Sequence, residues 1–186
     1  MLTVTGTGPT PLGQPINVLV GGLNLIAYGV DLNIPLAFGD YDVTFALPTD
    51  VAYGPRAAWI YANYGATVGA GLAVQLALWD LTHDGGDGFD AGAVQLNPTF
   101  PAPIRGLAVS ILTASIGQSS TEARIAYLTG IPSGLPGQTL ILAPESLTFS
   151  VADVEVPEPG TGLCLAAALL LGAAWERFRS QSPRSH

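Results

Sequence analysis

The sequence AGLAVQLALWDLT, residues 70–82, is one of the two segments on which the predicted helices of this chain are centred. Its apolar residues recur at the spacing of one helix face: Val74, Ala77, Leu78 and Leu81. This spacing predicts a helix over Ala70–Thr82. A second helix is predicted just before it, over Pro55–Tyr64, because proline suits the first helical position and glycine follows the end.

Strand signals surround these two helices. Ile16–Val20 and Leu23–Leu32 are rich in β-formers, and the Gly21-Gly22 pair between them suits a tight hairpin. Tyr41–Leu47 alternates apolar and polar residues with the period of a half-buried strand. Two further strands are predicted, over Gln138–Ala143 and Leu147–Val154. A third helix is predicted over Ser119–Leu128, where a serine can cap the first turn and Glu122 follows early.

These elements predict one α+β domain over residues 1–152. Its antiparallel strands would form a sheet or a small barrel, and two or three helices would pack against it. The 48% hydrophobic content excludes a wholly disordered chain. The formal net charge of −8, with six arginines and no lysine, argues against a nucleic-acid partner, which requires a basic surface.

An acidic, glycine-rich loop, Asp84–Asp90, follows the predicted helix at 70–82. Its sequence GGDGFD, residues 85–90, fits one copy of a calcium-binding repeat that normally occurs as a stack. Carboxylates at Asp80, Asp84, Asp87 and Asp90 are the hard oxygen ligands that calcium prefers. We take Asp84, Asp87 and Asp90 as the candidate metal set, and a solvated acidic loop without a cofactor as the alternative.

The sequence offers no convincing catalytic set. His83 is the sole histidine before the C-terminal tail, and no serine occupies a nucleophile-elbow motif. Phosphate-loop and dinucleotide fingerprints are absent from the sequence. We therefore expect a protein that is not an enzyme.

The C-terminus has three parts in a fixed order. The motif Val156-Pro157-Glu158-Pro159 is followed by an uncharged apolar run, Gly160–Trp175, and then by a tail that contains Arg177 and Arg179. This order resembles the PEP-CTERM sorting signal of Gram-negative bacteria. The resemblance implies an exported protein that an exosortase recognises at the membrane. Residues 153–159 would then be a linker, and residues 160–186 a transmembrane helix with a basic stop.

Physical arguments support this interpretation of the tail. The run of 16 residues is slightly short of the ~20 that span a bilayer, and Arg177 can snorkel to lengthen it. The arginines predict that the tail stays in the cytoplasm. Permanent anchoring without cleavage, or a buried helix of a soluble domain, are the alternatives. Met1–Gln14 lacks the features of a signal peptide, so we expect that the natural chain starts further upstream.

The central segment resembles a thioester-domain-type module of bacterial surface proteins. The resemblance rests on Ala57-Ala58-Trp59-Ile60-Tyr61 followed by Val74–Asp80, which contains Gln75-Leu76-Ala77-Leu78-Trp79. It rests also on Tyr28-Gly29-Val30-Asp31-Leu32 and on Gly137-Gln138-Thr139-Leu140-Ile141. In that family a cysteine forms an internal thioester with a glutamine side chain. Gly29 stands where the cysteine would be, so no thioester can close, and Gln75 would keep its position without its partner. We expect Gln75 to hydrogen-bond backbone, as a buried amide should.

Together, these features predict a non-enzymatic protein of the cell surface or exopolysaccharide matrix, which an exosortase sorts and cleaves. It would be a degenerate adhesin whose partners are the exosortase, the membrane before processing, and exopolysaccharide. The alternative is a calcium-dependent carbohydrate-binding module that uses the acidic loop and nearby aromatic residues such as Phe89. Trp59 and Trp79 are expected in the core rather than on a sugar-binding surface.

Overall fold

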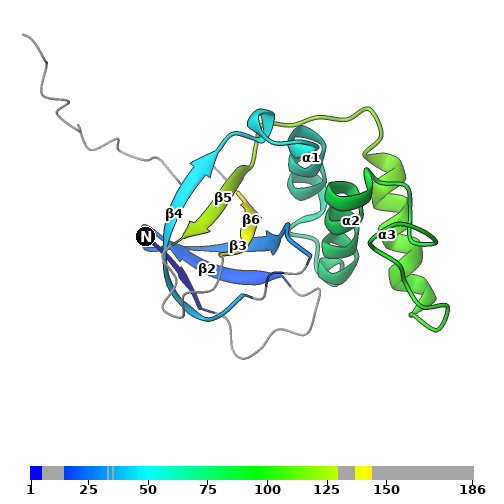
Figure 1. The fold of residues 1–186 in the computed structure, drawn as a ribbon, viewed down its shortest axis with the longest axis horizontal. Coiled ribbons are helices and arrows are strands. Elements are labelled where there is room, and N and C mark those ends of the chain that lie inside the picture. The colour runs from blue at the N-terminus through cyan, green and yellow to red at the C-terminus, as the bar shows by residue number, and fades with distance from the viewer. Residues whose placement is uncertain (6–14, 33, 35, 130–136, 144–186) are drawn as a thin grey trace, which may run out of the picture. The chain divides into compact units, whose positions relative to one another are not determined.

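Six antiparallel strands close into a barrel in the order β1-β2-β3-β6-β5-β4, and β4 pairs back onto β1 (Figure 1). The computed structural model describes residues 1–5, 15–32, 34, 36–129 and 137–143. The strands are β1 (Leu2–Val4), β2 (Ile16–Val20), β3 (Leu23–Gly29), β4 (Gly39–Ala46), β5 (Arg124–Thr129) and β6 (Thr139–Leu142). The expected α+β class is confirmed, and the sheet is the closed form of the two that the sequence allows.

The hairpin between β2 and β3 forms at the glycine pair, as predicted. Val20 pairs with Leu23, so Gly21 and Gly22 make the whole turn. Both glycines have positive φ angles, 57° and 86°, which L-residues with a side chain adopt reluctantly. A two-residue turn with two positive φ angles matches the twist of the flanking strands, and this fixes the register of the hairpin.

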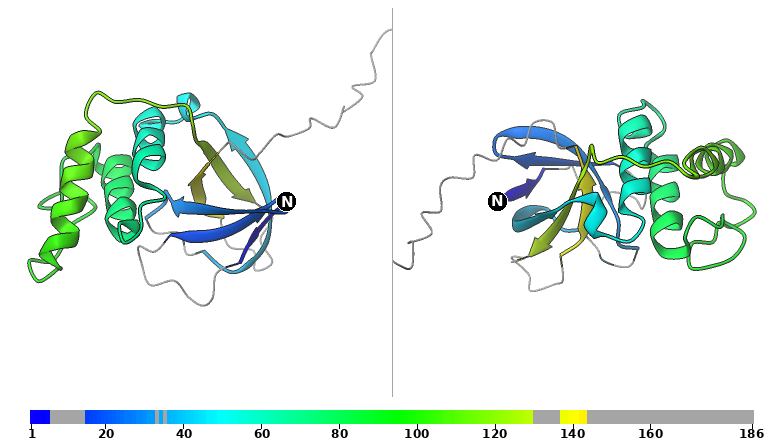
Figure 2. Two further views of the ribbon diagram at one scale, coloured as in Figure 1. Left: turned by 180° about the vertical axis from the view of Figure 1, so that it is seen from behind. Right: turned by 90° about the horizontal axis from the view of Figure 1, so that it is seen from above.

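Three helices lie together on one side of the barrel: α1 (Gly54–Tyr64), α2 (Gly71–Asp84) and α3 (Ala102–Ala114) (Figure 2). A short 3₁₀ helix, η1 (Pro48–Asp50), leads from β4 into α1. The strands under the helices serve two cores, since successive side chains point to opposite faces. On β3, Ala27 faces the barrel interior and Tyr28 faces the helices. On β6, Leu140 and Leu142 face inward and Ile141 faces the helices.

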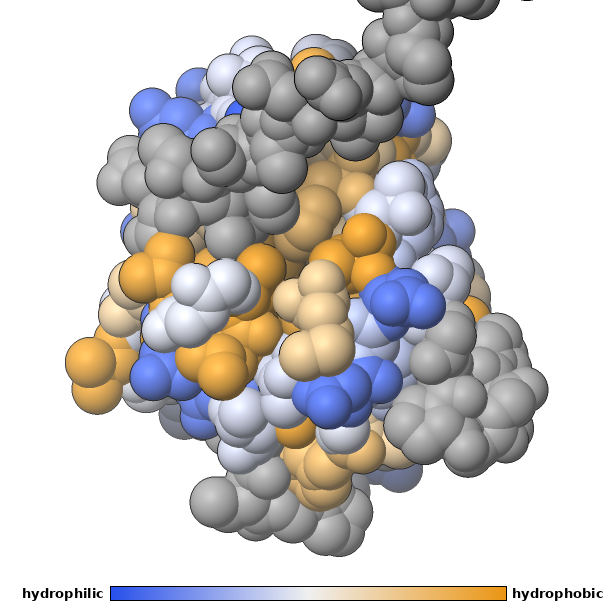
Figure 3. Space-filling model, turned by 90° about the vertical axis from the view of Figure 1, so that its left-hand side faces the viewer, coloured by the Kyte–Doolittle hydropathy of each residue, from blue (hydrophilic) through white to orange (hydrophobic). Residues whose placement is uncertain are grey.

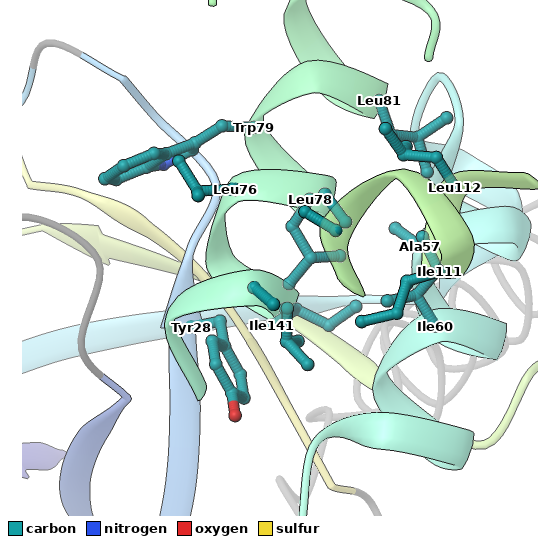
Figure 4. Packing of buried hydrophobic residues seen from close by; sticks show 14 of the residues in the cluster. Tyr28, Ala57, Ile60, Leu76, Leu78, Trp79, Leu81, Ile111, Leu112 and Ile141 are labelled. Atoms are coloured by element: carbon teal, nitrogen blue, oxygen red, sulfur yellow. The ribbon is translucent and has the colours of Figure 1, made fainter. Parts of the chain in front are cut away.

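Helix α2 is buried on every side rather than on the single face that the sequence predicts. All nine residues from Ala73 to Leu81 are buried. Leu81 lies beside Leu112 of α3, whereas Leu76 and Trp79 lie on the opposite side of α2 (Figure 4). An all-round apolar helix is typical of an element enclosed by its neighbours. Two polar residues, Gln75 and Asp80, are buried with it.

The prediction of a helix over Ser119–Leu128 is wrong. Ser120 and Glu122 form a local turn, in which the Glu122 amide donates to the Ser120 hydroxyl at 3.0 Å. The chain then enters β5, which pairs with both β4 and β6. The serine signal for a helix start is equally a signal for such a turn. Pairing on both sides, which completes the barrel, decides between the two.

Helix α3 and strand β1 are absent from the sequence-based prediction. Helix α3 buries Ala108, Ile111 and Leu112 at helical spacing, and it starts directly after Pro101. Strand β1 has three residues, too few for an alternation pattern to be recognised, yet it pairs with both β2 and β4.

Several predictions fall outside the described residues. These are the strand at Leu147–Val154, the sorting motif Val156–Pro159, the apolar run Gly160–Trp175 and the arginines Arg177 and Arg179. Within the part of the chain that the structure describes, no helix is both long and apolar enough to cross a membrane.

Figure 3 looks onto the end of the barrel that faces away from the helices. Apolar side chains gather near the middle of this face, and hydrophilic side chains lie among and around them. Apolar and hydrophilic side chains therefore adjoin one another in this view. The groups that could carry chemistry lie elsewhere, along α2.

Candidate functional site

The side chain of Gln75, in α2, forms two hydrogen bonds with the backbone of Gly29, the last residue of β3. The Gly29 amide donates to Gln75 Oε1 at 3.1 Å, and Gln75 Nε2 donates to the Gly29 carbonyl at 2.5 Å. Gln75 is only 2% exposed, so both bonds are shielded from water. A buried amide that satisfies both polar groups of one residue is a firm joint between helix and strand, as expected for a buried glutamine.

A second glutamine, Gln138, occupies the space beside Gly29 where a side chain would start. A Cβ atom on Gly29 would lie 2.5 Å from Gln138 Nε2, 2.8 Å from Cδ and 3.0 Å from Oε1. Gly29 therefore allows this close approach, and a larger residue at position 29 would require the end of the Gln138 side chain to shift. Gln138 is itself buried. The amide that a side chain at position 29 would meet first is that of Gln138, not that of Gln75.

Asp31 fixes the position of Gln138 and of the strand after it. Gln138 Nε2 donates to the Asp31 carbonyl at 3.1 Å, and the Thr139 amide donates to Asp31 Oδ2 at 2.6 Å. The fold thus brings together three segments that lie far apart in the sequence, around residues 28–32, 75 and 137–141. All three belong to the segments on which the resemblance to thioester-type modules rests.

Two tyrosines lie next to the Gly29 junction, by which we mean the contacts of Gly29 with Gln75 and Gln138. Tyr28 and Tyr61 meet edge to face with ring centroids 6.1 Å apart. The Tyr28 hydroxyl donates to the Gly65 carbonyl at 2.8 Å, and burial raises the pKa of Tyr28 to about 12. A hollow of about 420 Å³ opens beside Tyr28, between β3 and the loop that joins α1 to α2.

The acidic loop forms a cluster, but its members differ from those predicted. Carboxylate oxygens of Asp80, Asp84 and Asp87 all lie within 4.8 Å of one another. Asp90 is outside this group, because it pairs instead with Arg105 at the exposed surface. The clustered carboxylates share Asp84 and Asp87 with the candidate metal set of Asp84, Asp87 and Asp90, and their third member is Asp80.

Asp80 is the unusual member of this acidic cluster. It is 0% exposed, its Oδ2 accepts a hydrogen bond from the Gly88 amide at 3.2 Å, and its Oδ1 has no hydrogen-bond partner. Desolvation by burial raises the pKa of Asp80 to about 6, and the neighbouring Asp87 and Asp84 charges add to the shift. A buried carboxylate oxygen without a partner is costly, and such groups call for an explanation.

Asp84 has a different environment. Its two oxygens accept hydrogen bonds from the Ala93 and Val94 amides, each at 2.8 Å. These bonds lower the pKa of Asp84, so it is a firmly ionised carboxylate. They also fold the loop back onto the end of α2, which holds Asp84 in the cluster.

Arg56 is the basic side chain of α1 that reaches the ends of the other two helices. Its guanidinium donates to Ser115 Oγ at 2.8 Å, to the Leu112 carbonyl at 2.9 Å and to the Gly85 carbonyl at 3.2 Å. All three acceptors lie at or just after the C-terminal ends of α2 and α3, where the helix dipoles favour a cation. Among the described residues, Arg56 forms no ion pair with the three clustered carboxylates, although its charge lowers the pKa of Asp80.

The remaining residues singled out from the sequence, His83 and three aromatic residues, contact backbone or pack in or against the core. The ring of His83 lies on the chain after Gly29, where its Nε2 is 3.2 Å from the Leu32 amide and 3.1 Å from the Val30 carbonyl. Trp79 is buried, and Trp59 is half-buried against Tyr64. Phe89 is only 2% exposed and belongs to the helical core. The expectation that Phe89 contributes to a sugar-binding surface is therefore wrong.

The chain matches no protein family, no curated protein and no solved structure in comparisons with known proteins. The interpretation of the site consequently rests on its geometry. Sequence reasoning missed the part played by Gln138 beside Gly29 and that of Arg56. The spacing of Asp80 and Asp84, four residues apart on one helix, was the signal that could have placed Asp80 in the cluster ahead of Asp90.

Proposed function

We propose that this chain is a non-enzymatic, exported protein of the cell surface or exopolysaccharide matrix. Its globular domain is a thioester-type scaffold that has lost the cysteine and holds its parts together without a covalent bond. Its C-terminal tail is a sorting signal that an exosortase recognises and cleaves.

One observation carries the scaffold part of the proposal: residues 29, 75 and 138 converge. The resemblance concerned short segments that lie apart in the sequence and need not meet in the fold. In the fold, Gln75 binds the backbone of Gly29, and the Gln138 amide fills the place of a side chain at that position. An amide carbon beside a cysteine side chain is the arrangement that an internal thioester needs.

The resemblance makes Gln75 the former thioester partner, whereas the geometry favours Gln138 for that role. Gln75 uses both ends of its amide on the Gly29 backbone, so it acts as a scaffold group. Gln138 presents its amide to the side-chain position of residue 29, and it is the better candidate for the former thioester partner. We therefore propose Gly29 and Gln138 as the degenerate pair, with Gln75 as their support.

The sorting part of the proposal rests on the order of motif, apolar run and arginines at 156–179. It is tested by the intact mass of the protein purified from its native host. Cleavage by an exosortase predicts a mass that ends near Pro159. A mass that includes every residue to His186 would contradict processing and leave permanent anchoring as the explanation.

The scaffold part is tested by restoring a cysteine with the variant Gly29→Cys. The new sulfur attacks the side-chain carbonyl carbon of Gln138, a C–S bond forms, the C–N bond breaks, and ammonia leaves with the thiol proton. The atom closest to the new Cβ is Gln138 Nε2, which is the atom expelled, so closure relieves the crowding. Intact mass spectrometry should show the loss of one ammonia.

Two further variants identify the amide that reacts. Gln138→Glu in the Gly29→Cys background should abolish the loss of ammonia, because a carboxylate offers no amide nitrogen to expel. Gln75→Glu in the same background should retain it. The unchanged chain, whose single cysteine is Cys164, is the control for reactions elsewhere. If Gly29→Cys folds and keeps its full mass, the thioester-type ancestry of the site is rejected.

A further inference from the structure

We propose that the carboxylates of Asp80, Asp84 and Asp87 form a binding site for one calcium ion at the C-terminal end of α2. Their oxygens lie within 4.8 Å of one another. Two oxygens bound to the same calcium at ~2.3–2.6 Å can be at most about 5 Å apart. The three side chains can therefore share one ion with little movement of the loop.

The buried Asp80 carboxylate is the independent observation that points to a ligand. Its Oδ1 is inaccessible to solvent and has no hydrogen-bond partner, while its Oδ2 is held by the Gly88 amide. A cation held among the three carboxylates would offset the charge of this buried group, one of whose oxygens lies within 4.8 Å of oxygens of Asp84 and Asp87. Without a cation, burying an unpaired carboxylate oxygen opposes folding.

The surroundings of the cluster also favour a cation. The carboxylates stand where α2 ends at Asp84, and the negative end of a helix dipole disfavours further negative charge. Among the described residues, the one ion pair joins Arg105 to Asp90, so no ion pair neutralises the cluster. The nearby Arg56 is held by the Gly85 and Leu112 carbonyls and by Ser115.

The loop already holds the ligands in place. Gly85 ends α2 with a positive φ of 76°, and its amide donates to main-chain carbonyls of the last helical turn, including that of Leu81. Both Asp84 oxygens accept backbone amides. A carboxylate offers about four lone-pair positions, so these bonds leave room for a metal. Asp87 is exposed, which leaves the remaining coordination positions to water.

Calcium is favoured over magnesium by the chemistry of the site. Calcium accepts six to eight oxygen ligands in flexible arrangements, whereas magnesium demands near-ideal octahedral geometry and sheds its waters reluctantly. A short loop with one buried and one exposed carboxylate matches the first requirement better. This proposal does not depend on the sorting tail or on the Gly29 junction, so it can fail without affecting either.

The test is thermal unfolding of the intact chain in EDTA, in CaCl2 and in MgCl2, together with calorimetric titration of CaCl2. At a hundredfold excess over Kd, calcium should raise Tm by roughly 5–10 °C. Magnesium should raise it by much less. An equal response to the two ions, or no response to either, would overturn the proposal.

Three variants assign the effect to the cluster. Asp87→Asn changes an exposed residue, so the variant should fold normally and lose most of the calcium shift. Asp80→Asn should lose the shift while unfolding in EDTA at the same temperature as the unchanged chain or higher. Asp90→Asn is the matched control, because Asp90 lies outside the cluster, and it should keep the full shift. A calcium shift that survives in both Asp80→Asn and Asp87→Asn would refute the site.

Discussion

Gln75 and Gly29, which are 46 residues apart in the sequence, exchange two buried hydrogen bonds that fasten α2 to the end of β3. Backbone groups at the end of a strand usually find a partner on a neighbouring strand. Here a side chain from the central helix completes that requirement. The joint is polar, yet it lies within the helical core.

Replacing Gln75 by methionine keeps most of the side-chain volume and removes the amide. The Gly29 amide and carbonyl would both lose their partner in a buried place, so we expect a loss of about 2–4 kcal/mol in the free energy of unfolding. Denaturant titration of the intact chain measures this. Gln118→Met, at an exposed position after α3, is the control and should change stability by less than about 0.5 kcal/mol. Equal stability of the two variants would show that the joint is unimportant.

The pH dependence of stability should report the buried Asp80 carboxyl when no metal is present. Its pKa is about 6 in the folded protein against an ordinary 3.8, so the folded state binds the proton more tightly. This contribution to stability is fully present below pH 3.8 and is lost as the pH rises through 6. In EDTA, we therefore expect Tm to fall between these two pH values.

The variant Asp80→Asn should flatten this part of the Tm profile. Asp84 acts in the opposite direction, because its pKa is lowered: its contribution is present above its ordinary pKa and is lost in more acidic solution. The other charged groups that shift the pKa of Asp80 are Asp87 and Arg56. An unchanged slope in Asp80→Asn would assign the pH dependence to another group.

Arg56 and Arg105 should differ sharply in their importance. Arg56 makes three hydrogen bonds to the ends of two helices, so Arg56→Met should lower the free energy of unfolding by about 2–4 kcal/mol. Arg56→Lys should recover only part of this, because an ammonium cannot reproduce the planar fork of donors.

Arg105 pairs with Asp90, whose side chain is 92% exposed. Arg105→Met should therefore cost less than about 1 kcal/mol. Denaturant titration of the three arginine variants side by side gives the comparison. A larger loss in Arg105→Met than in Arg56→Met would reverse our assignment of which arginine supports the fold.

The sequence predicted the elements whose patterns are local. The Gly21-Gly22 hairpin and the strands around it, the two helices at 54–64 and 71–84, and the strand at 139–142 lie close to their predicted positions. The helix predicted over Ser119–Leu128 failed because the fate of that segment depends on β4 and β6, which pair with it from distant parts of the chain. Local propensity does not contain that information.

For the candidate site, too, the sequence predicted what depends on local motifs and missed what depends on contacts with distant segments. Gln75 and the region of Gly29 could be singled out from short motifs, and their meeting follows from the fold. The position of the Gln138 amide beside Gly29 could not be deduced, because it depends on the register of β6 against β3. In the acidic loop the residue types were right, but the pairing of Asp90 with Arg105 depends on where α3 lies, and α3 was not predicted.

The ring of strands has a consequence for a protein at high local concentration. An open sheet ends in two strands whose amides and carbonyls can recruit another chain, and such edges seed aggregation. Here the three residues of β1 occupy the gap between β2 and β4, so every described strand has a neighbour on both sides. We expect the folded domain to resist aggregation at high concentration. Removal of residues 1–5 would expose the unpaired edges of both β2 and β4, and we expect it to promote aggregation.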